Sequence, residues 1–212
     1  MDLLTQLSES LKAGEEEKAG ELTRQAIREG VPPKEILERG LIAGMTAVGE
    51  QFKAHEIFLP EVLLAAKAMA AGMGELKPLL LKEGIPTLGK VILGTVQGDL
   101  HDIGKNLVGI MLRGAGFEVI DLGRDVSPQK FVEAAKKEGA GVIGMSALLT
   151  TTMPAMRSTV ALLKEQGLAG KVKTIIGGAP VTAEYARGIG ADAHGYDGTS
   201  AVEEVKRLIR GT

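Results

Sequence analysis

The sequence predicts an α/β protein in which an N-terminal four-helix bundle precedes a C-terminal five-stranded parallel sheet. Apolar residues recur at helical spacing through the first 81 residues, and short apolar runs alternate with amphipathic helical stretches after residue 87. Between these patterns, mixed charge, glycine and proline mark a domain boundary. We therefore expect a helical bundle domain at 1–86 and an α/β domain at 87–212.

The composition fits two aliphatic cores and excludes several kinds of site. The 212 residues carry a net charge of −2, which gives no electrostatic basis for binding nucleic acid or an anionic membrane. Apolar residues make up 44% and aromatic residues only 3%, so aliphatic side chains must fill the cores. Cysteine is absent, which excludes disulfides and thiolate metal ligands. The sequence shows neither a secretion signal nor a membrane span, so we expect a cytoplasmic protein.

Four helices with short connections are expected in the first domain. The first places leucines on one face and ends at Gly14, the second covers 15–28, and the third covers 34–52. The fourth begins near Pro60, because proline suits the first turn of a helix. Helices joined in this way form bundles. Pro78 and residues 82–87 are predicted to form the linker to the second domain.

The joint between the third and fourth helices, residues 52–59, contains two of the four phenylalanines. One interpretation is a hydrophobic staple into the bundle core. The other is an apolar lid over a ligand. His55, in the same loop, is expected to be an exposed residue rather than a ligand.

From residue 88 onward, strands and helices are expected to alternate. The predicted strands are 91–96, 118–122, 142–145, 173–176 and 193–195, and the predicted helices are 105–113, 128–137, 153–166, 183–189 and 202–209. This alternation requires right-handed crossovers and a parallel sheet covered by helices on both faces. For five strands we expect the flavodoxin-like, Rossmann-type order 2-1-3-4-5.

A polar turn at 98–105 follows the first predicted strand, at the edge where such sheets bind ligands. In an extended turn, side chains two residues apart point the same way. Asp99 can therefore bond one imidazole nitrogen of His101 while the other nitrogen faces a ligand, which is how metal-binding histidines are usually oriented. Taken alone, Asp-x-His is more often an ordinary turn hydrogen bond.

Two further motifs follow later strands. Ser146 and Leu148 come after the third strand, and Gly177-Gly178 after the fourth. Singly, Ser146 is better explained as a helix cap and the glycines as an ordinary turn. Together with the Asp-x-His turn they favour a single ligand site, because glycine lets backbone approach a ligand closely. Thr150, Thr151 and Thr152 could bond such a ligand or cap the next helix.

In order and context, Asp99-x-His101-x-x-Gly104, Ser146-x-Leu148 and Gly177-Gly178 resemble the cobalamin-binding signature of corrinoid proteins. The resemblance is to those of anaerobic methyltransferase systems serving methanol, methylamines or O-demethylation, and to the cobalamin-binding region of methionine synthase. It covers nearly the whole chain. A dinucleotide or P-loop site is disfavoured, because no Gly-x-Gly-x-x-Gly follows the first strand and no Gly-Lys-Ser/Thr occurs.

The resemblance implies a cofactor, cobalamin or a related cobamide, whose own lower base is displaced from cobalt. His101 would take the axial position on the metal, Asp99 would accept a hydrogen bond from it, and Ser146 would extend this relay. These three are the expected catalytic residues, and the displaced base would enter a slot in the α/β domain. The full expected cofactor-binding set is Gly98, Asp99, His101, Asp102, Ile103, Gly104, Ser146, Leu148, Thr150, Gly177 and Gly178, with Phe52 and Leu59 from the cap.

The resemblance further implies a methyl carrier that is not catalytic alone. It would receive a methyl group from a substrate-specific methyltransferase and pass it to a second methyltransferase for a tetrahydrofolate-type or thiol acceptor, with a reductive activator as a third partner. The main alternative is a cobalamin-binding regulatory or sensor module, although we expect no DNA-binding domain before Leu3. The small subunit of a cobalamin-dependent mutase and a flavodoxin-like interaction domain without cofactor are the others.

Overall fold

The computed structural model describes residues 2–83 and 87–211. The chain forms two compact units. The helical unit contains the residues up to 87 together with 113–116, and the α/β unit contains 88–112 and 117–212. Helices come first and a five-stranded parallel sheet follows, so the predicted fold class is confirmed.

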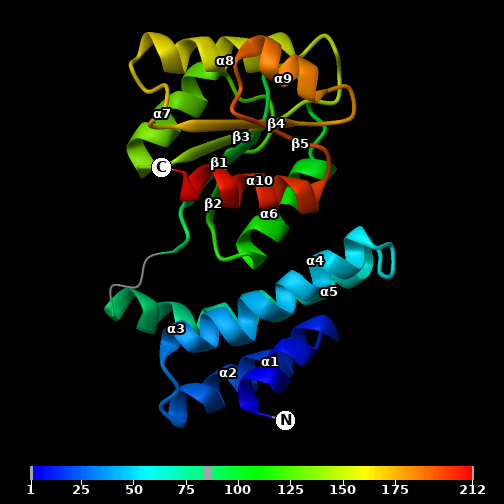
Figure 1. Cartoon of the computed structure of the whole chain (residues 1–212), viewed down its shortest axis with the longest axis vertical. Helices are drawn as coiled ribbons and strands as arrows, with labels where there is room; N and C mark the ends of the chain where they lie inside the picture. The colour runs from blue at the N-terminus through cyan, green and yellow to red at the C-terminus, as the bar shows by residue number, and fades with distance from the viewer. Residues whose placement is uncertain (1, 84–86, 212) are drawn as a thin grey trace. The chain divides into compact units, whose positions relative to one another are not determined.

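The helical unit is built on buried aliphatic side chains. Its elements are α1 (Leu3–Lys12), α2 (Glu16–Arg28), α3 (Pro33–Glu35), η1 (Ile36–Ile42), α4 (Ala43–Lys53) and α5 (Leu59–Lys82), labelled in Figure 1. The Asp2 side chain caps α1 by accepting a hydrogen bond from the Thr5 N–H at 2.7 Å. Leu7, Leu11 and Leu76 are fully buried, as the low aromatic content leads one to expect.

The third predicted helix runs without a break through α3, η1 and α4, but η1 is a π-helical segment. Two glycines of this helix lie against α1. A Cβ atom on Gly40 would lie 2.6 Å from Leu7 Cδ2, and one on Gly44 would lie 2.9 Å from the Ser8 carbonyl oxygen. Glycine at both positions therefore lets the two helices pack closely. Hydrophobic periodicity does not distinguish such a wide turn from an α-helix.

The prediction that Pro78 belongs to the linker is wrong. Pro78 lies inside α5, which continues to Lys82. A proline removes one helical hydrogen bond and crowds the carbonyl four residues earlier, but the buried side chains of Leu76 and Leu80 flank it and favour the continued helix. Residues 84–86 of the predicted linker lie outside the described residues. Within the part that is described, no helix is both long and apolar enough to cross a membrane.

The α/β unit contains a parallel sheet with the strand order β2-β1-β3-β4-β5, which confirms the predicted order. The strands are β1 (Lys90–Thr95), β2 (Glu118–Asp121), β3 (Val142–Ser146), β4 (Lys173–Gly177) and β5 (Ala193–Gly195). The helices are α6 (Ile103–Gly114), α7 (Pro128–Glu138), α8 (Pro154–Glu165), α9 (Ala183–Ile189) and α10 (Gly198–Arg210). Figure 1 shows α7, α8 and α9 on one face of the sheet and α6 and α10 on the other.

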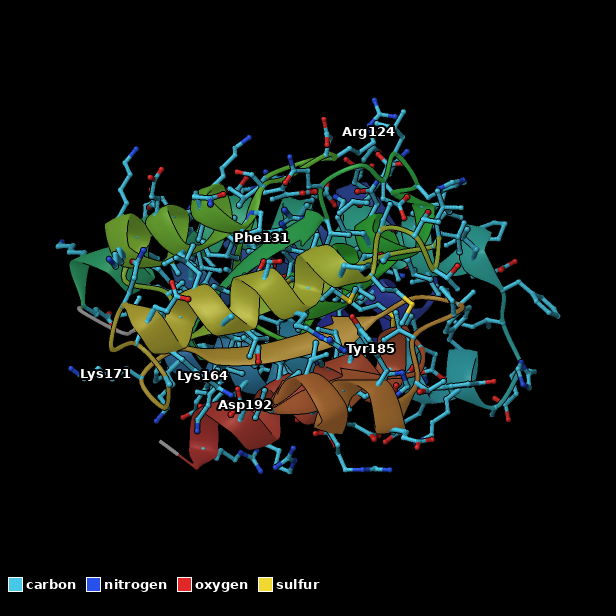
Figure 2. The ribbon with its side chains drawn as sticks, turned by 90° about the horizontal axis from the view of Figure 1, so that it is seen from above. Arg124, Phe131, Lys164, Lys171, Tyr185 and Asp192 are labelled. Atoms are coloured by element: carbon cyan, nitrogen blue, oxygen red, sulfur yellow. The ribbon has the colours of Figure 1, made fainter. Side chains whose placement is uncertain are left out.

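Phe131 of α7, labelled in Figure 2, is the largest side chain in the core beneath α7 and α8 and is fully buried. Its ring lies over β1 at Gly94, where a Cβ atom would come within 2.8 Å of two ring carbons. Ile92, Ile143 and Met156 complete the buried surroundings. Gly94 is thus explained by packing, because it makes room for this aromatic ring.

The register of the strands aligns the three predicted motifs. At the carboxyl edge of the sheet, Thr95 pairs with Ser146, Ser146 with Gly177, and Gly177 with Gly195. The turns that follow β1, β3 and β4 therefore leave the sheet at the same level. Residues about 80 positions apart in the chain meet here because parallel strands end at one edge.

Candidate functional site

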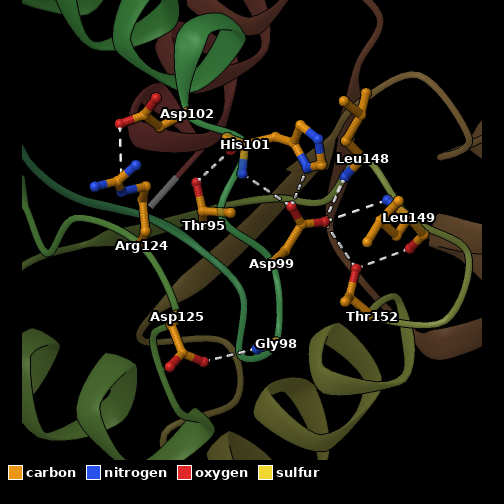
Figure 3. A network of polar contacts seen from close by, with 10 residues as sticks. All are labelled: Thr95, Gly98, Asp99, His101, Asp102, Arg124, Asp125, Leu148, Leu149 and Thr152. Atoms are coloured by element: carbon orange, nitrogen blue, oxygen red, sulfur yellow. Dashed lines mark hydrogen bonds and ion pairs between the residues drawn. The ribbon is translucent and has the colours of Figure 1, made fainter.

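Asp99 is the centre of a polar network in the turn after β1, shown in Figure 3. The residue is fully buried. Its Oδ1 atom accepts hydrogen bonds from the backbone N–H of His101 at 3.0 Å and from His101 Nδ1 at 2.8 Å. Its Oδ2 atom accepts from the N–H groups of Leu148 (2.8 Å) and Leu149 (3.2 Å) and from Thr152 Oγ1 (2.8 Å). These donors saturate the accepting capacity of a carboxylate.

Two opposing effects set the charge of Asp99. Burial raises the pKa of this carboxyl group, but the hydrogen bonds from the His101 and Leu148 N–H groups, the His101 ring and the Thr152 hydroxyl outweigh burial and hold the pKa well below its usual range. Asp99 is therefore an ionised acceptor, so Nδ1 of His101 must be the donor. In the neutral imidazole, the lone pair is then on Nε2. The His101 side chain is 53% exposed, which leaves it accessible to a ligand.

The backbone of the turn is held as firmly as the side chains. The fully buried Thr95 donates its hydroxyl to the His101 carbonyl oxygen at 2.9 Å. The Gly98 N–H donates to Asp125 Oδ1 at 2.7 Å. Asp102, a predicted cofactor contact, forms an exposed ion pair with Arg124 at 3.8 Å. Three separate contacts thus constrain the residues on both sides of His101.

The start of α6 contains a buried charge that sequence reasoning missed. Ile103 begins the helix as an exposed residue, and Gly104 follows it with open space where a Cβ would lie. Lys105 is buried, and its ammonium group donates to Asp121 Oδ2 at 2.5 Å and to Asn106 Oδ1 at 2.6 Å. A positively charged lysine in the first turn of a helix is disfavoured by the helix dipole. Its presence there in the sequence could have indicated that it has an acidic partner.

An apolar rim, defined here as Leu100, Ile103, Leu148 and Leu149, accompanies His101. All four side chains are exposed: Leu100 lies in the turn after β1, Ile103 begins α6, and Leu148 and Leu149 lie in the turn after β3. Large exposed apolar side chains in one place are typical of a binding surface for a ligand or partner. Leu100 and Leu149 were not predicted as site residues, although each is adjacent in sequence to one that was.

Gly177, which ends β4, and Gly178, which follows it, allow close approach of backbone to backbone. A Cβ atom on Gly177 would lie 2.8 Å from the Gly195 carbonyl oxygen. Gly178 has a φ of +127°, and a Cβ atom there would overlap the Ala147 carbonyl oxygen. Neither position accommodates a side chain without movement of the main chain. The glycine pair is therefore a structural necessity of this edge.

Ser146 and Thr150 do not cap the following helix, so that interpretation is wrong. Helix α8 begins at Pro154 behind Met153, which makes no side-chain cap. Ser146 ends β3 between Thr95 and Gly177, and Thr150 is exposed in the following loop. The hydroxyl that bonds Asp99 is that of Thr152, for which the sequence offered a ligand contact or a helix cap but not this bond. The relay through Ser146 stays a prediction.

The remaining predicted residues lie elsewhere. Phe52 near the end of α4 and Leu59 at the start of α5 are half-buried in the helical unit, and their role over a ligand stays a prediction. His55 is exposed, as predicted. His194 in β5 bonds the Val181 carbonyl oxygen through Nε2 at 2.9 Å. Across residues 2–83 and 87–211, no three His, Cys, Asp or Glu side chains gather as a metal-ion site.

Comparison with protein families identifies both halves of the chain. Residues 89–206 match a family model described as a B12 binding domain. Residues 3–77 match a second model with the same description. The two matches cover the sheet with its helices and most of the helical unit.

Individual relatives match almost the full length. Trimethylamine corrinoid protein 2 of Methanosarcina acetivorans is 46% identical over 211 residues, covering 99% of this chain and 97% of that protein. Dimethylamine corrinoid protein of Methanosarcina barkeri is 50% identical over 179 residues, covering 84% of each. The predicted resemblance to corrinoid proteins is confirmed.

Two solved structures are also similar over the whole chain. The methanol:cobalamin methyltransferase complex from Methanosarcina barkeri contains a chain that matches with a TM-score of 0.87 and 32% identity, covering 99% of this chain and 80% of that one. A cobalamin-binding protein from Desulfitobacterium hafniense matches with a TM-score of 0.80 and 34% identity, covering 98% of each chain.

Proposed function

Because the chain belongs to the family of corrinoid proteins with B12-binding domains, we propose that it carries a methyl group on a corrinoid cofactor between two methyltransferases. The relatives named above are a trimethylamine and a dimethylamine corrinoid protein, and a structural neighbour is part of a methyltransferase complex. These similarities support a methyl carrier over a regulatory module or a mutase subunit. When bound, the corrinoid supplies a cobalt centre that accepts and releases the methyl group.

The orientation of His101 is the observation that carries the proposal. Asp99 accepts the Nδ1 proton at 2.8 Å, so the unprotonated Nε2 is available as an axial ligand to cobalt. A single imidazole suffices as the protein's ligand when a macrocycle supplies the in-plane ligands of the metal. The cofactor would then bind with its own lower base displaced, because that base and His101 would compete for one position.

The surroundings of His101 fit a flat and largely apolar macrocycle. The apolar rim offers four exposed side chains from the turns after β1 and β3 and the start of α6. At the same edge of the sheet, Gly177 is half-buried and Gly178 is exposed, and the absence of side chains there would let the displaced base approach the backbone. Ser146, between Thr95 and Gly177 in register, would contact the same base or extend the hydrogen-bond relay.

The partners and the cap complete the proposal. The first partner to examine is a methyltransferase specific for a methylated amine, because the relatives named above are corrinoid proteins of such amines. A second methyltransferase would pass the methyl group to a tetrahydrofolate-type or thiol acceptor, and a reductive activator would restore the cofactor after oxidation. Phe52 and Leu59 would shield the reactive face of the cofactor from water.

Electron paramagnetic resonance would test the axial ligand. Hydroxocobalamin is added to the purified protein, free cofactor is removed, and the bound cofactor is reduced to cobalt(II), with nitrogen-15 in all histidines. We expect the nitrogen splitting to change with the isotope in wild type and in His55→Ala, the matched control on the exposed histidine. The change should disappear in His101→Ala.

The possible outcomes separate the parts of the proposal. Retained cobalt with a splitting that ignores the histidine isotope would keep the cofactor and reject His101 as its ligand. Failure to retain cobalt would reject the corrinoid function under these conditions. Methyl transfer from methylated amines with purified partners would then distinguish a carrier from a sensor, since a sensor would bind the cofactor without turning over.

A further inference from the structure

Asp125 has an unusual conformation for an exposed residue. It lies in the loop between β2 and α7 and has a φ of +53°, in the left-handed region. In the described ranges, the only other non-glycine residue with a positive φ is His55. Aspartate tolerates this region better than most residues, but glycine would occupy it without strain. The choice of aspartate therefore requires a contribution from its side chain.

The side chain and backbone of Asp125 hold the turn on both sides of Asp99. Its Oδ1 atom accepts a hydrogen bond from the Gly98 N–H at 2.7 Å, and its own N–H donates to the Asp99 carbonyl oxygen at 3.1 Å. Figure 3 shows the first of these contacts below the Asp99 network. The first bond holds the peptide group between Gln97 and Gly98, and the second holds the peptide group after the Asp99 Cα atom, while the Asp99 N–H donates to the Val96 carbonyl oxygen at 3.0 Å. Together these bonds fix the direction in which the Asp99 side chain leaves the backbone.

The rest of the loop is tied to β1 in the same way, which makes Asp125 part of a rigid support. The Thr95 N–H donates to the Gly123 carbonyl oxygen at 2.9 Å, and the Val126 N–H donates to the Thr95 carbonyl oxygen at 3.0 Å. Val126 is fully buried. The loop thus has an anchored backbone from which the Asp125 carboxylate reaches Gly98.

We infer that Asp125 is a positioning residue for the Asp99–His101 pair. Without its carboxylate, Gly98 loses its partner and the turn is free to adopt states in which Asp99 no longer meets Nδ1 of His101. A ligand that needs the oriented imidazole then binds in proportion to the fraction of molecules that still hold it. The consequence for cofactor binding rests on the proposed function, whereas the orientation of the ring does not.

General loss of stability is the competing explanation, and the chain offers a matched control. Asp192, before β5, also accepts a hydrogen bond from a backbone N–H, that of Thr174 at 2.8 Å, and it lies at the amino edge of the sheet. Figure 2 shows Asp192 far from Arg124, the neighbour of Asp125. Asp192→Ala should therefore lower stability without changing His101.

The first experiment records long-range proton–nitrogen-15 spectra of the three histidine rings in the cofactor-free protein. It is made at alkaline pH, where free imidazole is neutral. Wild type should show His101 in one tautomer, with the proton on Nδ1. Asp125→Gly and Asp125→Ala should shift His101 toward a mixture of tautomers, whereas Asp125→Asn, which keeps an acceptor oxygen, should resemble wild type. His55 and His194 are internal references.

Asp125→Gly is the decisive variant, because it removes the acceptor and also relieves the left-handed strain. Its stability to denaturant should match or exceed that of Asp125→Ala while its His101 signal is equally disturbed. An undisturbed His101 in Asp125→Gly, or an equal disturbance in Asp192→Ala, would overturn the inference. Equal disturbance in Asp125→Asn would also overturn it, because the acceptor oxygen would then be irrelevant.

The second experiment measures hydroxocobalamin binding by absorbance. We expect the dissociation constant to rise about tenfold in Asp125→Gly, which corresponds to the loss of one hydrogen bond. Asp125→Asn and Asp192→Ala should bind like wild type. If wild type itself binds no hydroxocobalamin, the proposed function fails, while the spectra of the cofactor-free protein still decide the role of Asp125.

Discussion

Two turns at the same edge of the sheet are built on opposite principles. The turn after β1 is organised by side chains, because the buried Asp99 collects donors from its own turn and from the turn after β3. The turn after β4 is organised by the absence of side chains, since Gly177 and Gly178 lie where a methyl group has no room. The first turn orients the His101 ring, and the second brings the main chain at Gly177 and Gly178 close to that of Gly195 and Ala147.

The difference teaches how each turn responds to substitution. A hydrogen-bond network loses one contact at a time, and its remaining donors continue to stabilise the charge. A close backbone contact cannot be lost in part in this way, because an added methyl group must displace the main chain. We therefore expect substitutions in the glycine turn to affect folding most, and those in the Asp99 network to affect orientation first.

The largest effect is expected for Gly178→Ala. The new Cβ would overlap the Ala147 carbonyl oxygen, and the φ of +127° is strained for any L-residue. Together these should lower the free energy of unfolding by about 2–5 kcal/mol. Denaturant unfolding measures it, with Gly188→Ala as the control, because that helical position has open space. Equal stability of the two variants would show that the β4 turn adapts.

Asp99→Asn should have the next largest effect. The amide of asparagine has the size of the carboxylate, but one of its two oxygens is replaced by an NH₂ group. In either orientation of the amide, this NH₂ group faces hydrogen-bond donors that meet an oxygen in wild type. We expect a loss of about 2–4 kcal/mol in the free energy of unfolding, and a His101 ring that is no longer confined to one tautomer. Calorimetric unfolding and the ring spectra measure the two. A stable variant with an ordered ring would mean that the charge of Asp99 is not required.

The pH dependence of stability sharpens this prediction. The pKa of Asp99 is lower in the folded protein than in the unfolded chain, so its carboxylate stabilises the fold above the unfolded pKa, about 4. This contribution is lost as the pH falls further toward the folded-state pKa. The difference in unfolding free energy between wild type and Asp99→Asn should therefore be constant above about pH 5 and shrink below about pH 4. A constant difference into strong acid would contradict the assignment.

The sequence predicted the elements but not all of the contacts between them. Strand order and the Asp99–His101 pairing follow from local rules, namely strand–helix alternation and the geometry of residues two apart. Thr152, 53 residues after Asp99, meets it only because the turn after β3 folds back over the edge. Asp125 reaches Gly98 from a left-handed conformation that no periodicity encodes. Long-range contacts made by loops depend on the completed fold.

Thr152→Val should have the smallest effect. It tests whether the Asp99 network keeps His101 ordered after the loss of one donor. Thr152 Oγ1 lies 2.8 Å from both Asp99 Oδ2 and the Leu149 carbonyl oxygen, and its single proton favours the charged acceptor. Valine keeps the shape and removes only this donor, while four donors to Asp99 remain. We expect a loss of about 1 kcal/mol, no change in the His101 tautomer, and full recovery in Thr152→Ser. A disordered His101 ring in Thr152→Val would mean that the four remaining donors do not hold the network together. The network would then respond to a single substitution as strongly as the glycine turn does.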